Sequence, residues 1–225
     1  MDVNNLVQTV AIYALPVLFA ITLHEAAHGY VARHFGDLTA YAQGRVSLNP
    51  LRHIDPVGTI VVPLVILVTS IAAGGGGFLF GWAKPVPVNY SALRKPRQHM
   101  AWVAAAGPGA NLAMAIAWAI LLKVAVLLPD NGFSEPLELM SSAGIMVNLI
   151  FMFLNLLPIL PLDGGRIVAS LLPRRAAWQF AKLEPWGLPL LLLLMFVPVY
   201  GSNALSLILG PLLNESNALI RAMVL

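Results

Sequence analysis

The chain has 225 residues, of which 59% are hydrophobic and only 10% are charged, and its mean hydropathy is +0.80. Soluble domains carry about 25% charged residues, so this composition predicts an integral protein of the lipid bilayer. The net charge of +3 is small and confined to a few loops, which argues against a nucleic-acid partner. The chain contains no cysteine, so any metal must be bound by His, Asp, Glu or water.

Long apolar runs predict the first membrane segments. The first helix should extend from about Leu6 to Ala32, kinked at Pro16, and it should be retained because it lacks the basic leader of a cleaved signal. Val57 to Phe80 is apolar again and contains Gly74 to Gly77, where the chain could reverse. Gly81 to Asn89 should be extended, because each proline disfavours helix in the residue before it.

Three further helices are predicted in the rest of the chain. They should cover about Met100 to Leu128, about Leu139 to Leu157, and about Trp186 to Leu209, the last interrupted by Pro189 and Pro198. Pro158 to Gly165 should end the second of them. The runs together predict an all-α polytopic membrane protein with about four to six transmembrane segments and one re-entrant or extended β-like element.

Basic residues gather in three loops and predict the orientation of the chain. The groups are Arg33, Arg45 and Arg52, then Lys84, Arg94, Lys95 and Arg97, then Arg166, Arg174, Arg175 and Lys182. The positive-inside rule places all three loops in the cytoplasm and the acidic turn around Asp130 outside. The ends of Val57 to Phe80 must then share one membrane face. The run either dips in and returns, or crosses as a helix and comes back as extended chain.

A zinc-hydrolase pattern, His24-Glu25-Ala26-Ala27-His28, lies within the first apolar run. Residues four apart share one helix face, so both imidazoles can bind one Zn²⁺ while Glu25 acts as base on a water molecule. The alternative is a pair of buried polar residues bonded to neighbours, but a metal compensates better for polar groups in lipid. His24 lies about 14 Å along the helix from Arg33, which predicts a site about 10 Å below the cytoplasmic surface.

A catalytic zinc needs a third protein ligand. His34 has the spacing found in soluble zinc proteases, but their pattern requires glycine at position 31, where this chain has Val31. Asp163 follows a helix broken by Pro158 and Pro161, and it could be a carboxylate ligand or the N-cap of a new helix. The local sequence does not decide between these two roles.

The chain resembles the site-2 protease family of intramembrane zinc metalloproteases. His24 to His28 matches the family's HExxH motif, and Asn155 to Gly165 matches its NxxPxxPxxDG element. Further similar segments are Gly36 to Ala40, Gly44-Arg45 to Asn49-Pro50, Asp55-Pro56, Gly81 to Asn89, and Gly107-Pro108 to Asn111. The resemblance implies one Zn²⁺ per chain bound by His24, His28 and Asp163, with Glu25 as catalytic base.

The resemblance also implies a single metalloprotease domain over residues 1–225. Its catalytic core would cover about 6–182 and its C-terminal membrane helix about 186–210. We expect a minimal core form, because no room is found for the PDZ or CBS regulatory domains that many members carry. Asn155 could orient the substrate or assist the oxyanion, or it could make an interhelical hydrogen bond. Asn111 could likewise contact the substrate or the oxyanion, but a role in helix packing is the favoured interpretation.

A helical substrate hides its peptide bonds and must unwind before it is cleaved. Extended segments near the site, Gly81 to Asn89 or Gly44 to Leu48, could pair with an unwound substrate, with Val86 and Val88 as candidate contacts. The alternative is that both segments are interfacial loops.

The leading hypothesis is an intramembrane zinc endopeptidase that hydrolyses peptide bonds within or near the transmembrane segments of single-pass membrane proteins, in regulated intramembrane proteolysis. We expect it in a prokaryotic plasma (inner) membrane, with the active site toward the cytoplasm. The alternatives are a transporter that uses the same polar site, or a non-proteolytic scaffold that binds membrane proteins.

Overall fold

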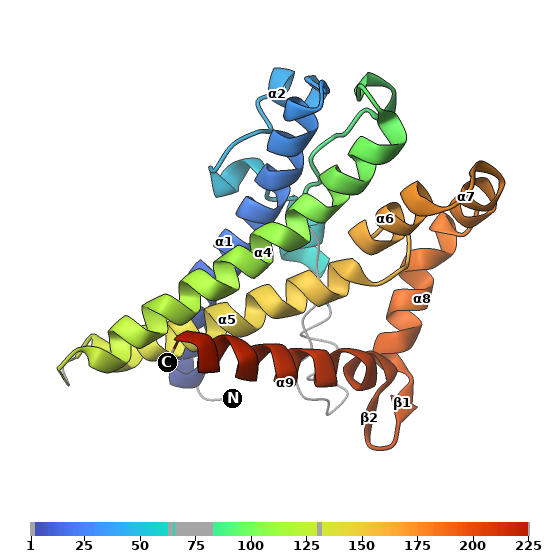
Figure 1. Cartoon of the computed structure of the whole chain (residues 1–225). Helices are drawn as coiled ribbons and strands as arrows, with labels where there is room; N and C mark the ends of the chain where they lie inside the picture. The colour runs from blue at the N-terminus through green and yellow to red at the C-terminus, as the bar shows by residue number, and fades with distance from the viewer. Residues whose placement is uncertain (1–2, 63–64, 66–82, 130–131, 225) are drawn as a thin grey trace.

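The computed structural model describes residues 3–62, 65, 83–129 and 132–224, and helices dominate them (Figure 1). The helices and strands are α1 (Val3–His34), α2 (Thr39–Ala42), η1 (Pro50–Arg52), η2 (Pro56–Val61), η3 (Tyr90–Ala92), α4 (Pro96–Leu127), α5 (Ser134–Leu156), α6 (Asp163–Leu171), α7 (Arg174–Ala181), α8 (Glu184–Phe196), β1 (Pro198–Val199), β2 (Ser202–Asn203) and α9 (Ala204–Val224).

Three helices in the described part of the chain are long and apolar enough to cross a membrane. They cover Val7–His34, Pro96–Leu127 and Ser134–Leu156, and α8 is a shorter apolar helix. The predicted class, an all-α polytopic membrane protein, is therefore confirmed. The helix α1 continues through Pro16 to His34, slightly beyond the predicted end.

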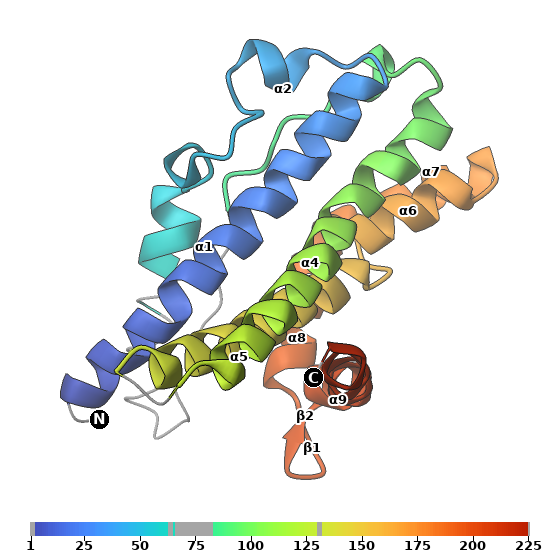
Figure 2. The same ribbon diagram turned by 60° about the vertical axis from the view of Figure 1, so that its left-hand side comes forward.

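The helices α1, α4 and α5 lie side by side and form the centre of the molecule (Figure 2). Helix association in lipid depends on close van der Waals packing, which small residues permit. Gly144 of α5 shows this, because a Cβ there would lie 2.3 Å from the Trp118 ring of α4. Trp118 therefore fits against α5 only where a side chain is missing. The same cluster includes Ile145 and Leu149, both fully buried.

Residues 83–89 are extended and lie beside α1, as predicted. Lys84 donates its backbone N–H to the His53 carbonyl at 2.9 Å, and Asn89 donates to Asp37 Oδ2 at 2.6 Å. The segments before and after residues 63–82 therefore meet at one end of α1. The predicted reversal point, Gly74 to Gly77, lies outside the described residues.

The chain breaks after Leu156 as the prolines predicted, and α6 begins at Asp163. Two glycines let this connection fold back closely, since a Cβ on Gly164 would lie 2.2 Å from the Leu156 carbonyl oxygen. At the other end of α6, Arg97 of α4 donates to the carbonyls of Ser170, at 2.8 Å, and of its two successors. The helix α6 is thus fixed against α4 at its C-terminus.

The helix expected from Trp186 to Leu209 is divided into two at Pro198, one of its two expected interruptions, whereas Pro189 lies inside α8. The helix α8 ends at Phe196, the strands β1 and β2 form a two-stranded antiparallel hairpin, and α9 begins at Ala204. Pro198 lacks an N–H to continue the helix, and Tyr200 and Gly201, with φ of 47° and 81°, make the turn. The helix α9 then packs against α5.

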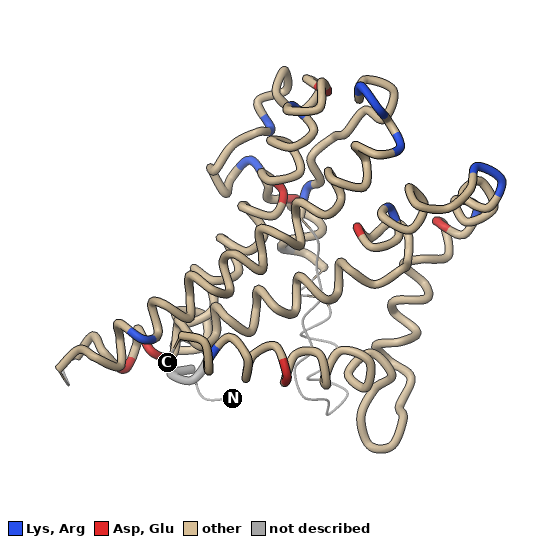
Figure 3. The backbone as a smooth tube through the Cα atoms, viewed as in Figure 1, with Lys and Arg blue, Asp and Glu red and all other residues tan. Residues whose placement is uncertain are grey.

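Basic side chains gather at one end of the long helices and at α6 and α7, as Figure 3 shows. The three basic loops are bonded together there. Arg94 Nε donates to the Phe35 carbonyl at 3.3 Å, and Arg97 bonds the end of α6. These contacts hold the three basic loops together at one end of the molecule, as a shared membrane face requires.

Candidate active site

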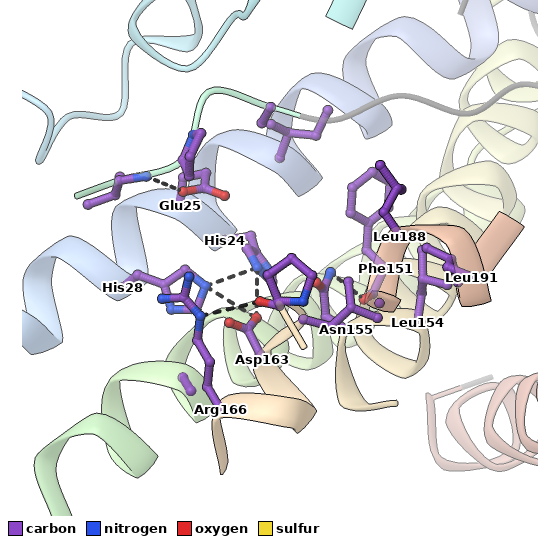
Figure 4. A pocket seen from close by; sticks show the side chains of 18 of the residues that line it. His24, Glu25, His28, Phe151, Leu154, Asn155, Asp163, Arg166, Leu188 and Leu191 are labelled. Carbon is purple, nitrogen blue, oxygen red and sulfur yellow. Dashed lines mark hydrogen bonds and ion pairs between the residues drawn. The ribbon is translucent and has the colours of Figure 1, made fainter. Parts of the chain in front are cut away.

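His24 and His28 lie one turn apart on α1, and Asp163, the first residue of α6, faces both of them (Figure 4). The two Nε2 atoms are 3.0 Å apart, and Asp163 Oδ2 lies 3.2 Å from His24 Nε2 and 3.3 Å from His28 Nε2. All three side chains are buried. His28 and Asp163, which are 135 residues apart in sequence, thus contribute with His24 to one group of three metal-binding atoms.

This triangle fits a zinc ion better than it fits a hydrogen-bonded cluster. Ligands of a tetrahedral zinc stand about 3.3 Å apart, and two nitrogens with one carboxylate oxygen are a common donor set. Asp163 Oδ2 is buried without a hydrogen-bond partner among the described residues. A buried carboxylate oxygen without a donor suits a cation.

Asp163 is not the N-cap of α6, which was the competing interpretation. Leu162 occupies the N-cap position, and no side chain caps the helix. His34 lies at the exposed C-terminal end of α1, with its ring against Phe35 at 5.1 Å. The helix continues through Val31, so His34 does not join His24 and His28.

The second nitrogen of each histidine is fixed by a buried acceptor. His24 Nδ1 donates to Asn111 Oδ1 at 2.6 Å, and His28 Nδ1 donates to the Val103 carbonyl at 2.7 Å. A carbonyl only accepts, so the Nδ1 of His28 carries the proton and its Nε2 offers a lone pair. Such partners orient metal-binding histidines and raise their basicity.

Asn111 is oriented in turn by Asn148, a residue that the sequence argument missed. Asn111 Nδ2 donates to Asn148 Oδ1 at 3.0 Å and to the Ala20 carbonyl at 3.3 Å, so its Oδ1 must face His24. Asn148 Nδ2 donates to the Gly144 carbonyl at 2.8 Å. Asn148 could have been found from the sequence, because an asparagine inside an apolar span is costly in lipid and indicates a functional role.

Of the two interpretations of Asn111, a substrate or oxyanion contact and a packing role, its position agrees with the second. Its side chain is completely buried behind His24 and does not line the cavity beside the site. Gly107, one turn earlier on α4, also lies against the histidines. A Cβ on Gly107 would lie 2.5 Å from both His24 Cε1 and His28 Nε2. The helix α4 therefore supports the site by close approach as well as by hydrogen bonding.

Comparison with known proteins assigns the chain to a protein family. The profile of peptidase family M50 matches residues 128–197, which include Asp163. The Bacillus subtilis (strain 168) protein named "Putative zinc metalloprotease YwhC" is 39% identical over 206 residues, covering 89% of this chain and 84% of that protein. The chain belongs to peptidase family M50, the site-2 protease family.

Two mycobacterial relatives of this M50 peptidase bear the name "Putative zinc metalloprotease Rip2". The protein from Mycolicibacterium smegmatis is 30% identical and that from Mycobacterium tuberculosis H37Rv is 32% identical, each over 185 residues. Each alignment covers 80% of this chain and 65% of the relative. No solved structure matches the chain. The predicted resemblance to the site-2 protease family is thus confirmed.

Glu25, the predicted base of this M50 peptidase, is half-buried and lines the cavity. Its Oε2 accepts the Val86 backbone N–H at 2.8 Å, so the carboxylate is turned toward the extended segment (Figure 4). Val86 and Val88, the candidate substrate contacts, both line the cavity. The Val86 N–H is therefore already occupied, whereas a substrate-pairing edge needs free donors. Gly44 to Leu48, the other candidate segment, forms no strand.

A cavity of about 630 Å³ opens beside the histidines and Asp163. Its wall opposite α1 is mainly apolar and includes Phe151, Leu154, Leu188 and Leu191. Asn155 also lines it, and its Nδ2 donates to the Phe151 carbonyl of the same helix at 3.0 Å. The interhelical bond considered for Asn155 is not found among the described residues. The cavity can therefore accept an apolar chain beside the polar site.

Proposed function

We propose that this chain is an intramembrane zinc endopeptidase, which hydrolyses peptide bonds within or near transmembrane segments of single-pass membrane proteins in regulated intramembrane proteolysis. The observation that carries the proposal is the buried triangle of His24, His28 and Asp163, at 3.0–3.3 Å, whose two histidines lie on a helix apolar enough to span a bilayer. One zinc per chain would be held by these three residues. The relatives' names, zinc metalloproteases, support the choice of metal.

The chain's own residues divide the work of hydrolysis. Bound zinc supplies a Lewis acid that polarises oxygen. Glu25, which follows His24 on the same turn, takes a proton from the attacking water and passes it to the leaving amine nitrogen. Asn111 and the Val103 carbonyl keep the two histidines in the required tautomer. Asn155 lines the cavity, and since its Nδ2 is bonded within α5, its Oδ1 would be the atom that accepts a substrate N–H.

The shape of the cavity supports a membrane-protein substrate. Its apolar wall suits the side chains of a transmembrane segment, while the site itself is polar, so an unwound apolar peptide would be bound beside the catalytic groups. The segment 83–89 offers extended backbone next to Glu25, and Val88 is the candidate contact that remains with its N–H unbonded among the described residues.

The direct test is to purify wild type and Glu25→Gln and incubate each with single-pass membrane proteins in vesicles. We expect the wild type to bind about one zinc and to cleave, and Glu25→Gln to bind zinc without cleaving, because only the base is lost. Equal cleavage by both would refute the role of Glu25. Transport activity without cleavage would favour the alternative of a transporter.

We propose a prokaryotic plasma (inner) membrane with the basic end of the molecule in the cytoplasm, following the positive-inside rule. Because the chain has no cysteine, single substitutions at Arg52, Lys95 and Leu127, all exposed, report orientation. Membrane-impermeant thiol reagents should reach positions 52 and 95 from the cytoplasmic side and position 127 from the other. Labelling of 52 and 95 from opposite sides would contradict the proposal.

A further inference from the structure

Glu25 is held by one backbone group of the extended segment 83–89. Among the described residues, the Val86 N–H is the donor that reaches the carboxylate, at 2.8 Å from Oε2. One carboxylate oxygen is thereby occupied, and Oε1 is left without a protein donor in the described part of the chain. Hydrogen bonds to charged groups are stronger than those between neutral groups, so this contact restrains the side chain appreciably.

The sequence around Val86 makes it a rigid and isolated donor. Pro85 and Pro87 flank it, and neither has an N–H. Their rings also fix φ near −65°, which limits how the Val86 peptide can turn. A backbone N–H between two prolines therefore points in one direction and offers Glu25 a single partner.

Both sides of Val86 are tied to the loop that follows α1. Arg45, which is buried, donates through Nη2 to the Lys84 carbonyl at 2.7 Å. On the other side, the Asn89 N–H donates at 2.6 Å to Asp37, whose side chain is completely buried. The segment is thus anchored before and after Val86, so its position relative to α1 is fixed.

Gly29 permits the approach of this segment to α1. It lies one turn beyond Glu25, and a Cβ there would be 3.4 Å from Val86 Cγ1 and 2.9 Å from Val46 Cγ2. The absent side chain leaves room for both valines against the helix. Val86 therefore sits against the face of α1 that carries Glu25.

We propose that Val86 is a positioning residue, whose backbone N–H holds the Glu25 carboxylate in place for proton transfer. The inference rests on the proposed function. With Oε2 fixed, Oε1 is the oxygen that takes the proton from water and later gives it up. Val86 also lines the cavity, so the segment that borders the substrate also sets the position of the base.

The test compares Val86→Pro, which removes the N–H, with Val86→Ala, which keeps it and shortens the side chain. Proline is compatible with extended backbone, and residue 86 already precedes Pro87 in the extended segment 83–89. We expect kcat of Val86→Pro to fall about tenfold below that of Val86→Ala, with KM changed less than about twofold, since a loosened base costs turnover rather than binding. Zinc content should be equal in the two variants.

Val88→Pro gives the second comparison, because the Val88 N–H has no hydrogen-bond partner among the described residues. If the segment acts only as an edge for substrate, Val86→Pro and Val88→Pro should raise KM alike and leave kcat similar. That result would overturn the proposal. A fall in kcat confined to Val86→Pro supports it.

A measurement without turnover covers the case in which Val86→Pro fails to fold. In metal-free protein labelled with ¹⁵N-valine, the Val86 amide proton resonance should move upfield when Glu25 is replaced by Ala. An unchanged resonance would overturn the proposal. Failure of the proposed function is recognised separately, because wild type would then not cleave, or Glu25→Gln would remain active.

Discussion

The two walls of the active site differ in what they bury. On the wall formed by α1 and α4, His24 is bonded to Asn111 at 2.6 Å and His28 to the Val103 carbonyl at 2.7 Å. Gly107 packs behind both histidines, so closely that an added Cβ would lie 2.5 Å from them. The wall formed by α5, α6 and α8 contributes Asp163 and otherwise mainly apolar side chains around a cavity of about 630 Å³.

This difference separates two tasks. On the first wall, there is no room for a Cβ between Gly107 and the histidines, and the histidine Nδ1 atoms are bonded, so the geometry of the two imidazoles is fixed before any ligand binds. The second wall has space and few polar groups, so it can accept apolar chains of different shape. Substitutions on the first wall should therefore affect metal binding, whereas substitutions on the second should affect substrate binding. The predictions below test that division.

The largest effect is expected where the two walls meet at the ligands. Asp163→Asn, His24→Ala and His28→Ala should each lose zinc and all measurable cleavage, because each removes one of three protein ligands. His34→Ala should keep both, since His34 is exposed at the end of α1. Metal analysis of the purified variants measures this. Zinc lost from His34→Ala but kept by Asp163→Asn would show that the ligand assignment is wrong.

Gly107→Ala should have the next largest effect on zinc binding. The added Cβ would lie 2.5 Å from atoms of both histidines, so α4 or the imidazoles must move. We expect strong loss of zinc, and overpacking of this kind costs about 1–3 kcal/mol of stability. Gly109→Ala is the matched control, because nothing lies within 4 Å of its added Cβ. Equal zinc content in the two variants would argue against the close approach of α4.

Asn111→Ala should weaken zinc binding without abolishing it. Loss of a partner that orients a metal-binding histidine typically costs about 10–100-fold in affinity. Competition with a chelator of known affinity measures the change. Ser141→Ala is the control, since Ser141 is equally buried on α5 but its Oγ makes no hydrogen bond in the described structure. Comparable loss in both variants would point to general destabilisation instead.

Leu154→Trp on the apolar wall should give the smallest effect, and it should change substrate binding and not zinc binding. The larger side chain fills part of the cavity, so KM for a membrane-protein substrate should rise several-fold while zinc affinity stays at the wild-type value. Leu156→Trp, on the exposed side of the same helix, should leave KM unchanged. A loss of zinc from Leu154→Trp would mean that the two walls are not separable.

The local sequence pattern determined the positions of the long helices, the break after α5 and the common face of the two histidines. Apolar run length placed the three long helices to within several residues, and the prolines placed both the break after α5 and the extended segment 83–89. The spacing of His24 and His28 fixed their common face, because helix periodicity is a local property. The residue types at these positions also defined the chemistry. The apolar run from Trp186 to Leu209 forms two helices and not one, and the break begins at Pro198, where an interruption was expected.

Contacts between distant helices were decided only by the tertiary structure. Sequence left Asp163 between a ligand and an N-cap, and the approach of α6 to α1 made it face the histidines. Sequence also left Asn111 between a substrate contact and a packing role, because its direction depends on how α4 rotates against α1. The bond from Val86 to Glu25 joins residues 61 apart. Periodicity gives the face of a helix, but the packing of glycines and buried amides determines which partner that face meets.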